Sequence, residues 1–325
     1  MARARPIVIA HRGASGYLPE HTLASKALAH AMGADFIEQD VVLTADAVPI
    51  VLHDIYLDST TDVAARYPHR ARNDGHFYAM DFTLDEVRTL KVHERCSVDN
   101  SGARHAVYPA RFPIDVALFG IPTLAEEINL IAGLDKSRDR RTGLYIELKS
   151  PNRHRAAGLD VTREVCRVLR DTGYAKRPEQ VFLQCFDDQT LRDLRTRLET
   201  PLPLIQLIAD NAWGEDSAVD YDYLRSAPGL DEVASYADGI GPWLAHIYQG
   251  RSAGGTAQVS DLVAQAQARG LLVHPYTLRK DDLPAGMACL ENLLELLLCD
   301  IGVDGVFTDF PDLVVGYLDG WQQGA

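Results

Sequence analysis

Four polar side chains near the N-terminus lie within or at the end of apolar, strand-like runs, where polar residues are unusual. Two apolar runs of strand-like length end at His11 and at His53, and a third run between them carries Glu38 and Asp40. Because side chains alternate along a strand, the two carboxylates would lie on one face. Carboxylates so close repel each other unless one is protonated or a cation lies between them. The spacing therefore predicts a site for Ca²⁺ or Mg²⁺, which prefer oxygen ligands.

Further residues fit phosphoryl chemistry around such a cation. His11 and His53 could act as general acid and general base near neutral pH, and the planar guanidinium of Arg12 suits a phosphate group. Glu147 and Lys149 lie two residues apart and share a strand face. Glu147 would be the third metal carboxylate, whereas Lys149 would neutralise a phosphate oxygen or pair with one of the acids.

Each of these features also has a common structural explanation. A histidine at a strand end is usually structural, two acids with one residue between them most often form surface ion pairs, and Arg-Gly after a strand is a common turn. Glu147 and Lys149 would then be an ion pair at the rim of a barrel. The recurrence of such residues at the ends of consecutive apolar runs favours one shared site.

The elements that would position these residues alternate along the chain. Strand-like runs cover 7–11, 35–43, 143–148, 181–186, 204–208, 238–241, 271–276 and 305–308. Helix-like segments cover 22–32, 123–132, 161–169, 188–198, 231–236, 259–268, 290–298 and 311–318. Eight such units predict an α/β protein with a closed TIM (β/α)8 barrel. The alternative is an open doubly wound sheet, but no G-x-G-x-x-G follows the first run.

In a TIM barrel the functional residues lie at the C-terminal ends of the strands. Gln184 and Phe186 lie at the end of one strand and share a face of it, and Tyr276 lies at the end of a different strand. We therefore add these three residues as candidates for substrate binding, although aromatic side chains at strand ends are more often part of the core.

Residues 55–120 break the regular pattern. They are rich in Arg, His, Asp, Asn and Gly, and only 83–90 has the cap and periodicity of a helix. A barrel loop of this length normally has a function or a structure of its own. We expect one domain over 1–325 in which 55–120 forms an insertion over the barrel mouth, the alternative being an insertion that does not contact substrate.

Composition limits the possible partners. The 46 acidic residues outnumber the 32 basic ones and give a net charge of −14, which disfavours nucleic acid and anionic membranes. A phosphodiester would need a local cation together with Arg12 and Lys149. The five cysteines show no zinc-site spacing or disulfide framework. No apolar run is long enough to cross a bilayer, so we expect no stable membrane insertion.

Several motifs together indicate a family. They read HRGASGYLPEHT from 11 to 22, GADFIEQD from 33 to 40 and VLHD from 51 to 54. Later segments continue the likeness at 147–149, 184–186, 238–242, 274–276 and 304–311. The chain resembles the glycerophosphodiester phosphodiesterase family, and most closely its bacterial periplasmic type. Many family members have Asn where this chain has His21, but the periplasmic type tends to have His.

The resemblance implies a TIM barrel that hydrolyses small-molecule glycerophosphodiesters, such as glycerophosphocholine or glycerophosphoethanolamine, to sn-glycerol 3-phosphate and an alcohol. The expected metal ligands are Glu38, Asp40 and Glu147, with Ca²⁺ favoured over Mg²⁺. His11 is the favoured base and His53 the favoured acid. The nucleophile would be water or the neighbouring glycerol hydroxyl of the substrate.

Two other functions stay open at this stage. The same barrel could act like a phospholipase D on lysophospholipid, or it could be a non-catalytic barrel that binds a phosphorylated ligand. The oligomer could be a monomer or a homodimer. The first six residues lack the apolar core of a signal peptide. The compartment would thus be the periplasm if a signal peptide has been removed, and the cytoplasm otherwise.

Overall fold

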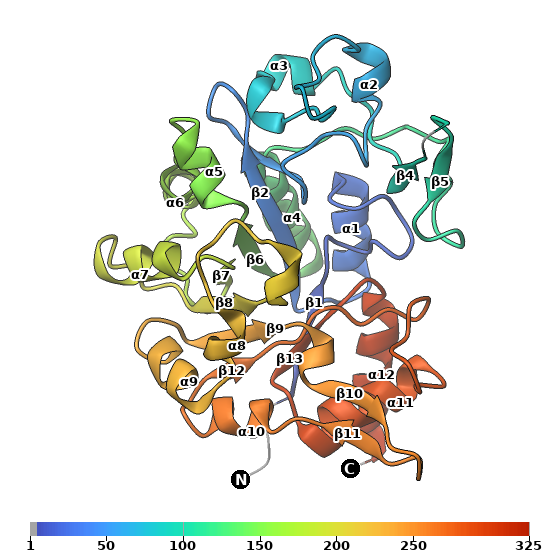
Figure 1. The fold of residues 1–325 in the computed structure, drawn as a ribbon, viewed down its shortest axis with the longest axis vertical. Helices are drawn as coiled ribbons and strands as arrows, with labels where there is room; N and C mark the ends of the chain where they lie inside the picture. The colour runs from blue at the N-terminus through green and yellow to red at the C-terminus, as the bar shows by residue number, and fades with distance from the viewer. Residues whose placement is uncertain (1–4, 100, 325) are drawn as a thin grey trace.

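Eight parallel strands succeed one another around a barrel in the computed structural model, which describes residues 5–99 and 101–324 (Figure 1). In sheet order they are β12 (Leu272–Val273), β9 (Gly239–Pro242), β8 (Leu204–Ile208), β7 (Val181–Cys185), β6 (Gly143–Leu148), β2 (Phe36–Leu43), β1 (Ile7–Ala10) and β13 (Gly305–Thr308). The sequence prediction of a TIM barrel is confirmed.

Backbone hydrogen bonds close the barrel between its first and last strands in that order. The amide of Asp304 donates to the carbonyl of Val273 at 3.1 Å, and the amide of Leu278 donates to that of Phe307 at 2.8 Å. An open doubly wound sheet would leave these strand edges unpaired. The alternative fold considered from the sequence is therefore wrong.

Large side chains fill the inside of the barrel, so the lower part of the strands forms a solid base for the site. This interior cluster consists of Ile9, Tyr145, Phe182, Ile205 and Phe307. A second and larger cluster lies between the outer faces of the strands and the helices. Such two-sided burial explains why the strands appear in the sequence as almost continuous apolar runs.

Helices cover the outside of the barrel in the connections between strands (Figure 1). The longer ones are α1 (Leu23–Ala31), α4 (Leu124–Arg138), α6 (Val161–Asp171), α7 (Asp188–Thr196) and α12 (Pro311–Gly324). Shorter ones are α5 (Pro151–Ala156), α8 (Tyr221–Leu224), α9 (Ala227–Val233), α10 (Leu262–Gln267) and α11 (Leu290–Leu294), the last continued by a π-helix over Glu295–Ile301. Within the described residues, no helix combines the length and the apolar character that crossing a membrane requires.

The insertion begins after β3 (Pro49–Val51), which pairs antiparallel with the end of β2. It contains α2 (Val63–Arg66), α3 (Leu84–Val87) and a hairpin of β4 (Cys96–Val98) and β5 (Arg104–Ala106). A separate hydrophobic cluster, which includes Phe82 and Leu90, holds it together. The insertion therefore has a small core of its own, and in Figure 1 it extends from the barrel beside β2 and α1.

Three expected elements differ clearly from the sequence prediction. The helix expected over 231–236 begins and ends earlier, as α9 (Ala227–Val233). The strand expected over 271–276 is reduced to β12, because Pro275 has no amide hydrogen to continue the ladder. The helix expected from 259 starts only at Leu262, because the chain first forms a hairpin of β10 (Tyr248–Arg251) and β11 (Ala257–Val259). The glycines at 250, 254 and 255 supply the turn chemistry of that hairpin.

Candidate active site

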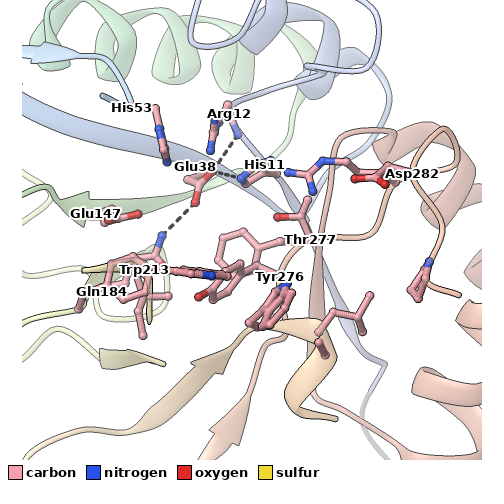
Figure 2. Close-up of a pocket in the computed structure, with 18 of the residues that line it drawn as sticks. His11, Arg12, Glu38, His53, Glu147, Gln184, Trp213, Tyr276, Thr277 and Asp282 are labelled. Carbon is pink, nitrogen blue, oxygen red and sulfur yellow. Dashed lines mark hydrogen bonds and ion pairs between the residues drawn. The ribbon is translucent and has the colours of Figure 1, made fainter. Parts of the chain in front are cut away.

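A cavity of about 730 Å³ opens at the C-terminal ends of the barrel strands (Figure 2). All ten residues selected from the sequence lie in its lining: His11, Arg12, Glu38, Asp40, His53, Glu147, Lys149, Gln184, Phe186 and Tyr276. The structure thus brings together residues that are up to 265 positions apart, from 11 to 276, in the place where TIM barrels bind their ligands.

Three carboxylates meet on one side of this cavity. Glu38, Asp40 and Glu147 each offer an oxygen, and these oxygens lie within 4.8 Å of one another. The register explains the meeting, since β2 and β6 pair Asp40 with Glu147. One oxygen of Asp40 and the amide oxygen of Gln184 are buried without a hydrogen-bond partner. Unpaired buried oxygens around a carboxylate cluster are the donor set that a hard divalent cation requires.

The carboxyl groups of this cluster do not ionise alike. Burial and the charges of Asp40 and Glu147 raise the pKa of Glu38 well above its usual range. Burial, together with the charge of Asp40, also raises the pKa of Glu147 to about 8 despite the opposing effect of Lys149. Burial opposes ionisation of Asp40 too, but the hydrogen bond from His21 and the charge of Lys149 hold its pKa well below the usual range. A bound cation would replace the protons that Glu38 and Glu147 otherwise retain.

A fully buried chain of polar residues supports Asp40. His21 Nε2 lies 2.8 Å from Asp40 Oδ2, and His21 Nδ1 lies 3.2 Å from Lys26 Nζ. Lys26 pairs with Glu127 at 2.8 Å. Because a lysine ammonium can only donate, Nδ1 of His21 must accept, and its Nε2–H donates to Asp40. This chain fixes both the orientation and the charge of the carboxylate.

Each of the two histidines at the cavity is backed by an aspartate. His11 Nδ1 lies 2.5 Å from Asp309 Oδ1, and His53 Nδ1 lies 2.6 Å from Asp54 Oδ1. An ionised carboxylate accepts, so Nδ1 donates in both cases and the lone pair of the neutral ring is on Nε2. Burial and the charge of Arg12 lower the pKa of His11 to about 4, and the same two effects lower that of His53 to about 3. Both rings are therefore neutral at pH 7 before substrate binds.

Arg12 is held in a strained position. Its φ of 57° lies in the left-handed region, and its amide donates to Glu38 at 2.8 Å. The next residue is Gly13 at φ 90°, where a Cβ would lie 2.5 Å from Ser25 Oγ. Glu20 accepts from Arg12 Nη1 at 3.1 Å, whereas the buried Nε lies 3.7 Å from Asp40 Oδ2 and makes no hydrogen bond. Strain of this kind is kept where surrounding contacts require it, and here the bonds of the Arg12 amide to Glu38 and of Nη1 to Glu20 are such contacts.

The remaining candidates line the same cavity as the histidines. Gln184 Nε2 donates to Glu38 at 3.0 Å, and Lys149 Nζ lies 2.8 Å from Glu147 Oε1. The rings of Phe186 and Tyr276 meet edge to face with centroids 6.2 Å apart. The hydroxyl of Tyr276 donates to a backbone carbonyl at 3.0 Å, so this residue presents its ring and not a free hydroxyl.

Sequence reasoning missed several residues that contact the site residues. Asp54 was quoted only as part of a motif, although its place next to His53 is a usable signal. Asp309 was included only as part of the motif segment 304–311. Arg95 and Arg111 were not selected at all, because they lie in the irregular insertion where no periodicity marks them. Trp213 and Glu215 also line the cavity.

The comparisons with known proteins indicate one family. The model of the "Glycerophosphoryl diester phosphodiesterase family" matches residues 11–313. A curated glycerophosphodiester phosphodiesterase of Haemophilus influenzae is 42% identical over 328 residues, which covers 97% of this chain and 90% of the relative. One from Treponema pallidum is 37% identical and covers 96% of this chain and 91% of the relative.

Solved structures show the same architecture. The chain superposes with a TM-score of 0.71 on a crystal structure from Silicibacter pomeroyi assigned to the same activity, at 26% identity, with coverage of 98% of this chain and 95% of the other. A phosphodiesterase from Oleispira antarctica, crystallised with the product sn-glycerol-3-phosphate, gives a TM-score of 0.63 at 22% identity, with coverage of 97% of each chain. The second likeness supports the fold only.

Proposed function

We propose that the described cavity is where this chain, which belongs to the glycerophosphoryl diester phosphodiesterase family and hydrolyses glycerophosphodiesters, releases sn-glycerol 3-phosphate and an alcohol. The observation that carries the proposal is the meeting of three buried carboxylates with two aspartate-backed histidines in one cavity at the strand ends. Such an arrangement combines an oxygen-ligand site with two proton-transfer groups.

We propose Glu38, Asp40 and Glu147 as ligands of a divalent cation, with Ca²⁺ preferred to Mg²⁺. The unpaired oxygens of Asp40 and Gln184 support this choice, since Ca²⁺ accepts many oxygen ligands, including amide oxygens, in flexible geometry. When bound, the cation supplies charge that stabilises the phosphate oxygens in the transition state.

His11 and His53 divide the proton transfers in this proposal. His11 is buried, and Asp309 keeps its Nε2 lone pair available, so His11 takes the proton of the attacking oxygen. His53 is 30% exposed along its side chain, which allows it to be protonated from solvent once the anionic substrate raises its pKa. It then protonates the alkoxide that leaves. Each positioned proton transfer contributes roughly 10²–10⁴-fold.

Arg12 and Lys149 bind the phosphodiester in this proposal. The Nε of Arg12 is buried without a hydrogen bond, 3.7 Å from Asp40 Oδ2, so a phosphate oxygen would supply the hydrogen-bond acceptor that it lacks. Lys149 is held by Glu147 at the same side of the cavity. Burial opposes the charge of Lys149, but Glu147 and Asp40 keep its pKa above the ordinary value. Both groups therefore stay cationic, which offsets the acidic character of the whole chain.

The substrates we propose are small glycerophosphodiesters such as glycerophosphocholine and glycerophosphoethanolamine. The cavity volume of about 730 Å³ is within the range of small-molecule sites. The rings of Phe186 and Tyr276 supply an apolar wall beside the polar groups. Gln184 would hold Glu38 in place and thereby support the phosphate end of the site.

The test is an assay of glycerol 3-phosphate release with chelator and with added Ca²⁺ or Mg²⁺. We expect chelation to abolish release and Ca²⁺ to restore it in the wild type, but not in Glu147→Gln at the same concentration. Glycerophosphocholine and lysophosphatidylcholine are compared in parallel. Release that survives chelation, or a preference for the lysophospholipid, would contradict the proposal.

A further inference from the structure

We propose that Arg95 and Arg111 of the insertion are positioning residues for the reaction, each acting on one histidine through the aspartate behind it. The inference rests on the proposed roles of His11 and His53. It gives the insertion a part in catalysis although none of its described residues, within 55–99 and 101–120, lines the cavity.

Arg111 reaches His11 through Asp309. Its Nη2 donates to Asp309 Oδ2 at 2.7 Å, while the other oxygen of Asp309 accepts from His11. The same guanidinium binds both oxygens of Asp281, at 2.8 and 3.0 Å, and stacks 3.7 Å from the ring of Tyr108. Its side chain is only 4% exposed. A guanidinium fixed on three sides presents one donor to Asp309 in a single direction.

Arg95 reaches His53 through Asp54 in the same way. Its Nη1 donates to Asp54 Oδ2 at 2.8 Å, while Asp54 Oδ1 accepts from His53. Its Nε and Nη2 bind the two oxygens of Glu20 at 2.8 and 2.6 Å. Glu20 in turn binds Arg12, so Arg95 braces the proposed phosphate ligand as well as the histidine.

One short hairpin carries both arginines. Arg95 directly precedes β4, Arg111 follows β5 closely, and the carbonyl of Arg95 accepts from the amide of Val107 at 3.2 Å. A shift of this hairpin would withdraw the donor from both aspartates together. The two aspartates would then differ in their remaining partners besides the histidine. Asp309 would still accept a hydrogen bond from Arg279 at 2.7 Å, whereas Asp54 would still accept one from the hydroxyl of Ser59.

The contact of Arg95 with Arg12 through Glu20 predicts distinct kinetics for the two variants. Arg111→Gln should lower kcat roughly 10- to 100-fold, the effect of losing one hydrogen bond between charged groups, and leave KM unchanged. Arg95→Gln should lower kcat by a similar factor and also raise KM, because Arg12 loses its brace. Arg111→Lys keeps the positive charge but lacks the planar guanidinium, so its kcat should lie between those of Arg111→Gln and the wild type.

Arg72→Gln is the matched control within the insertion. Arg72 also binds both oxygens of an aspartate, Asp81, at 2.7 Å, and it stacks 3.8 Å from Tyr78. Its side chain is 43% exposed, and these contacts do not lead to His11 or His53. It should leave kcat and KM unchanged. Circular dichroism and thermal unfolding of each variant establish that the compared proteins are folded.

A double-mutant cycle tests whether Arg111 acts through Asp309. If it does, Asp309→Asn combined with Arg111→Gln should lose no more activity than Asp309→Asn alone. Multiplicative losses, or a kcat of folded Arg111→Gln and Arg111→Lys equal to that of Arg72→Gln, would overturn the inference. His11→Ala distinguishes the premise from the inference. An active His11→Ala would refute the proposed role of His11, whereas an inactive one with normal arginine variants would refute only the inference.

Discussion

Replacing Asp309 with asparagine should place the lone pair of His11 on the wrong nitrogen. Asp309 Oδ2 accepts from Arg111 and Arg279, both at 2.7 Å, and Oδ1 accepts from His11 Nδ1 at 2.5 Å. Asparagine has the same shape but only one acceptor oxygen, which the two guanidinium groups would take. Its NH₂ would then face Nδ1, which must accept, so that the proton of the neutral imidazole moves to Nε2.

The expected loss follows from the hydrogen bonds involved. The charge-assisted bond from His11 to Asp309 is worth about 1.5–3 kcal/mol, which alone corresponds to a roughly 10- to 100-fold change. The asparagine NH₂ also donates toward His11 Nδ1, which is itself a donor in the productive tautomer. We therefore expect the proton transfer by His11 to be largely lost. That sets a ceiling of about 10²–10⁴-fold in kcat, with KM little changed because Asp309 does not contact substrate in this account.

The assay measures release of glycerol 3-phosphate from glycerophosphocholine at saturating Ca²⁺, for wild type, Asp309→Asn and Asp281→Asn. Asp281 binds Arg111 without touching His11, so its variant reports the effect of disturbing the arginine alone. A folded Asp309→Asn with the kcat of wild type would refute the tautomer argument. A loss in Asp281→Asn as large as that in Asp309→Asn would assign the effect to Arg111 instead.

Three further predictions follow from the same geometry. His53→Ala should lower kcat by about 10²–10⁴-fold with unchanged thermal unfolding, and a kcat close to wild type would remove His53 from the mechanism. Lys26→Met leaves Glu127 buried and unpaired and should cost about 3–5 kcal/mol in urea unfolding; Lys26→Met with Glu127→Leu should recover much of it, and failure to recover would contradict the pairing argument. In chelator, stability should fall as pH rises from about 6.5 to about 8, because the pKa of Glu147 is raised to about 8 in the folded state, whereas the unfolded chain has already lost this proton. Below pH 6.5 the lowered pKa values of His11 and His53 act in the opposite direction. Ca²⁺ should remove the fall above pH 6.5, and a melting temperature in chelator that does not fall between pH 6.5 and 8 would contradict the prediction.

The carboxylate cluster could be predicted because its geometry follows from local rules. Glu38 and Asp40 share a face through the period of a strand, and Glu147 joins them because neighbouring parallel strands end at the same edge of the barrel. The eight apolar runs located the strands for the same reason, since burial on both sides leaves a continuous apolar signal. The fold and the first contacts of the site were therefore accessible from the sequence.

The supports of the histidines were not accessible in this way. Arg111 and Asp309 are separated by 198 positions, and Arg111 lies in a segment whose conformation is set by turns and ion pairs without a repeating pattern. The hairpin of β10 and β11 was missed because its two strands are only four and three residues long. Charge pairing between irregular segments leaves no periodic signal, so only the folded structure reveals which arginine meets which aspartate.

The central claim is that Glu38, Asp40 and Glu147 hold one divalent cation, and crystals grown with Mn²⁺ as an anomalous scatterer test it most directly. An anomalous difference map should show one strong peak in the cavity, about 2.0–2.6 Å from an oxygen of each carboxylate. Crystals of Glu147→Gln under the same conditions should show a weaker peak or none. A map of the wild type with no peak between these three residues, or with its strongest peak elsewhere, would contradict the account.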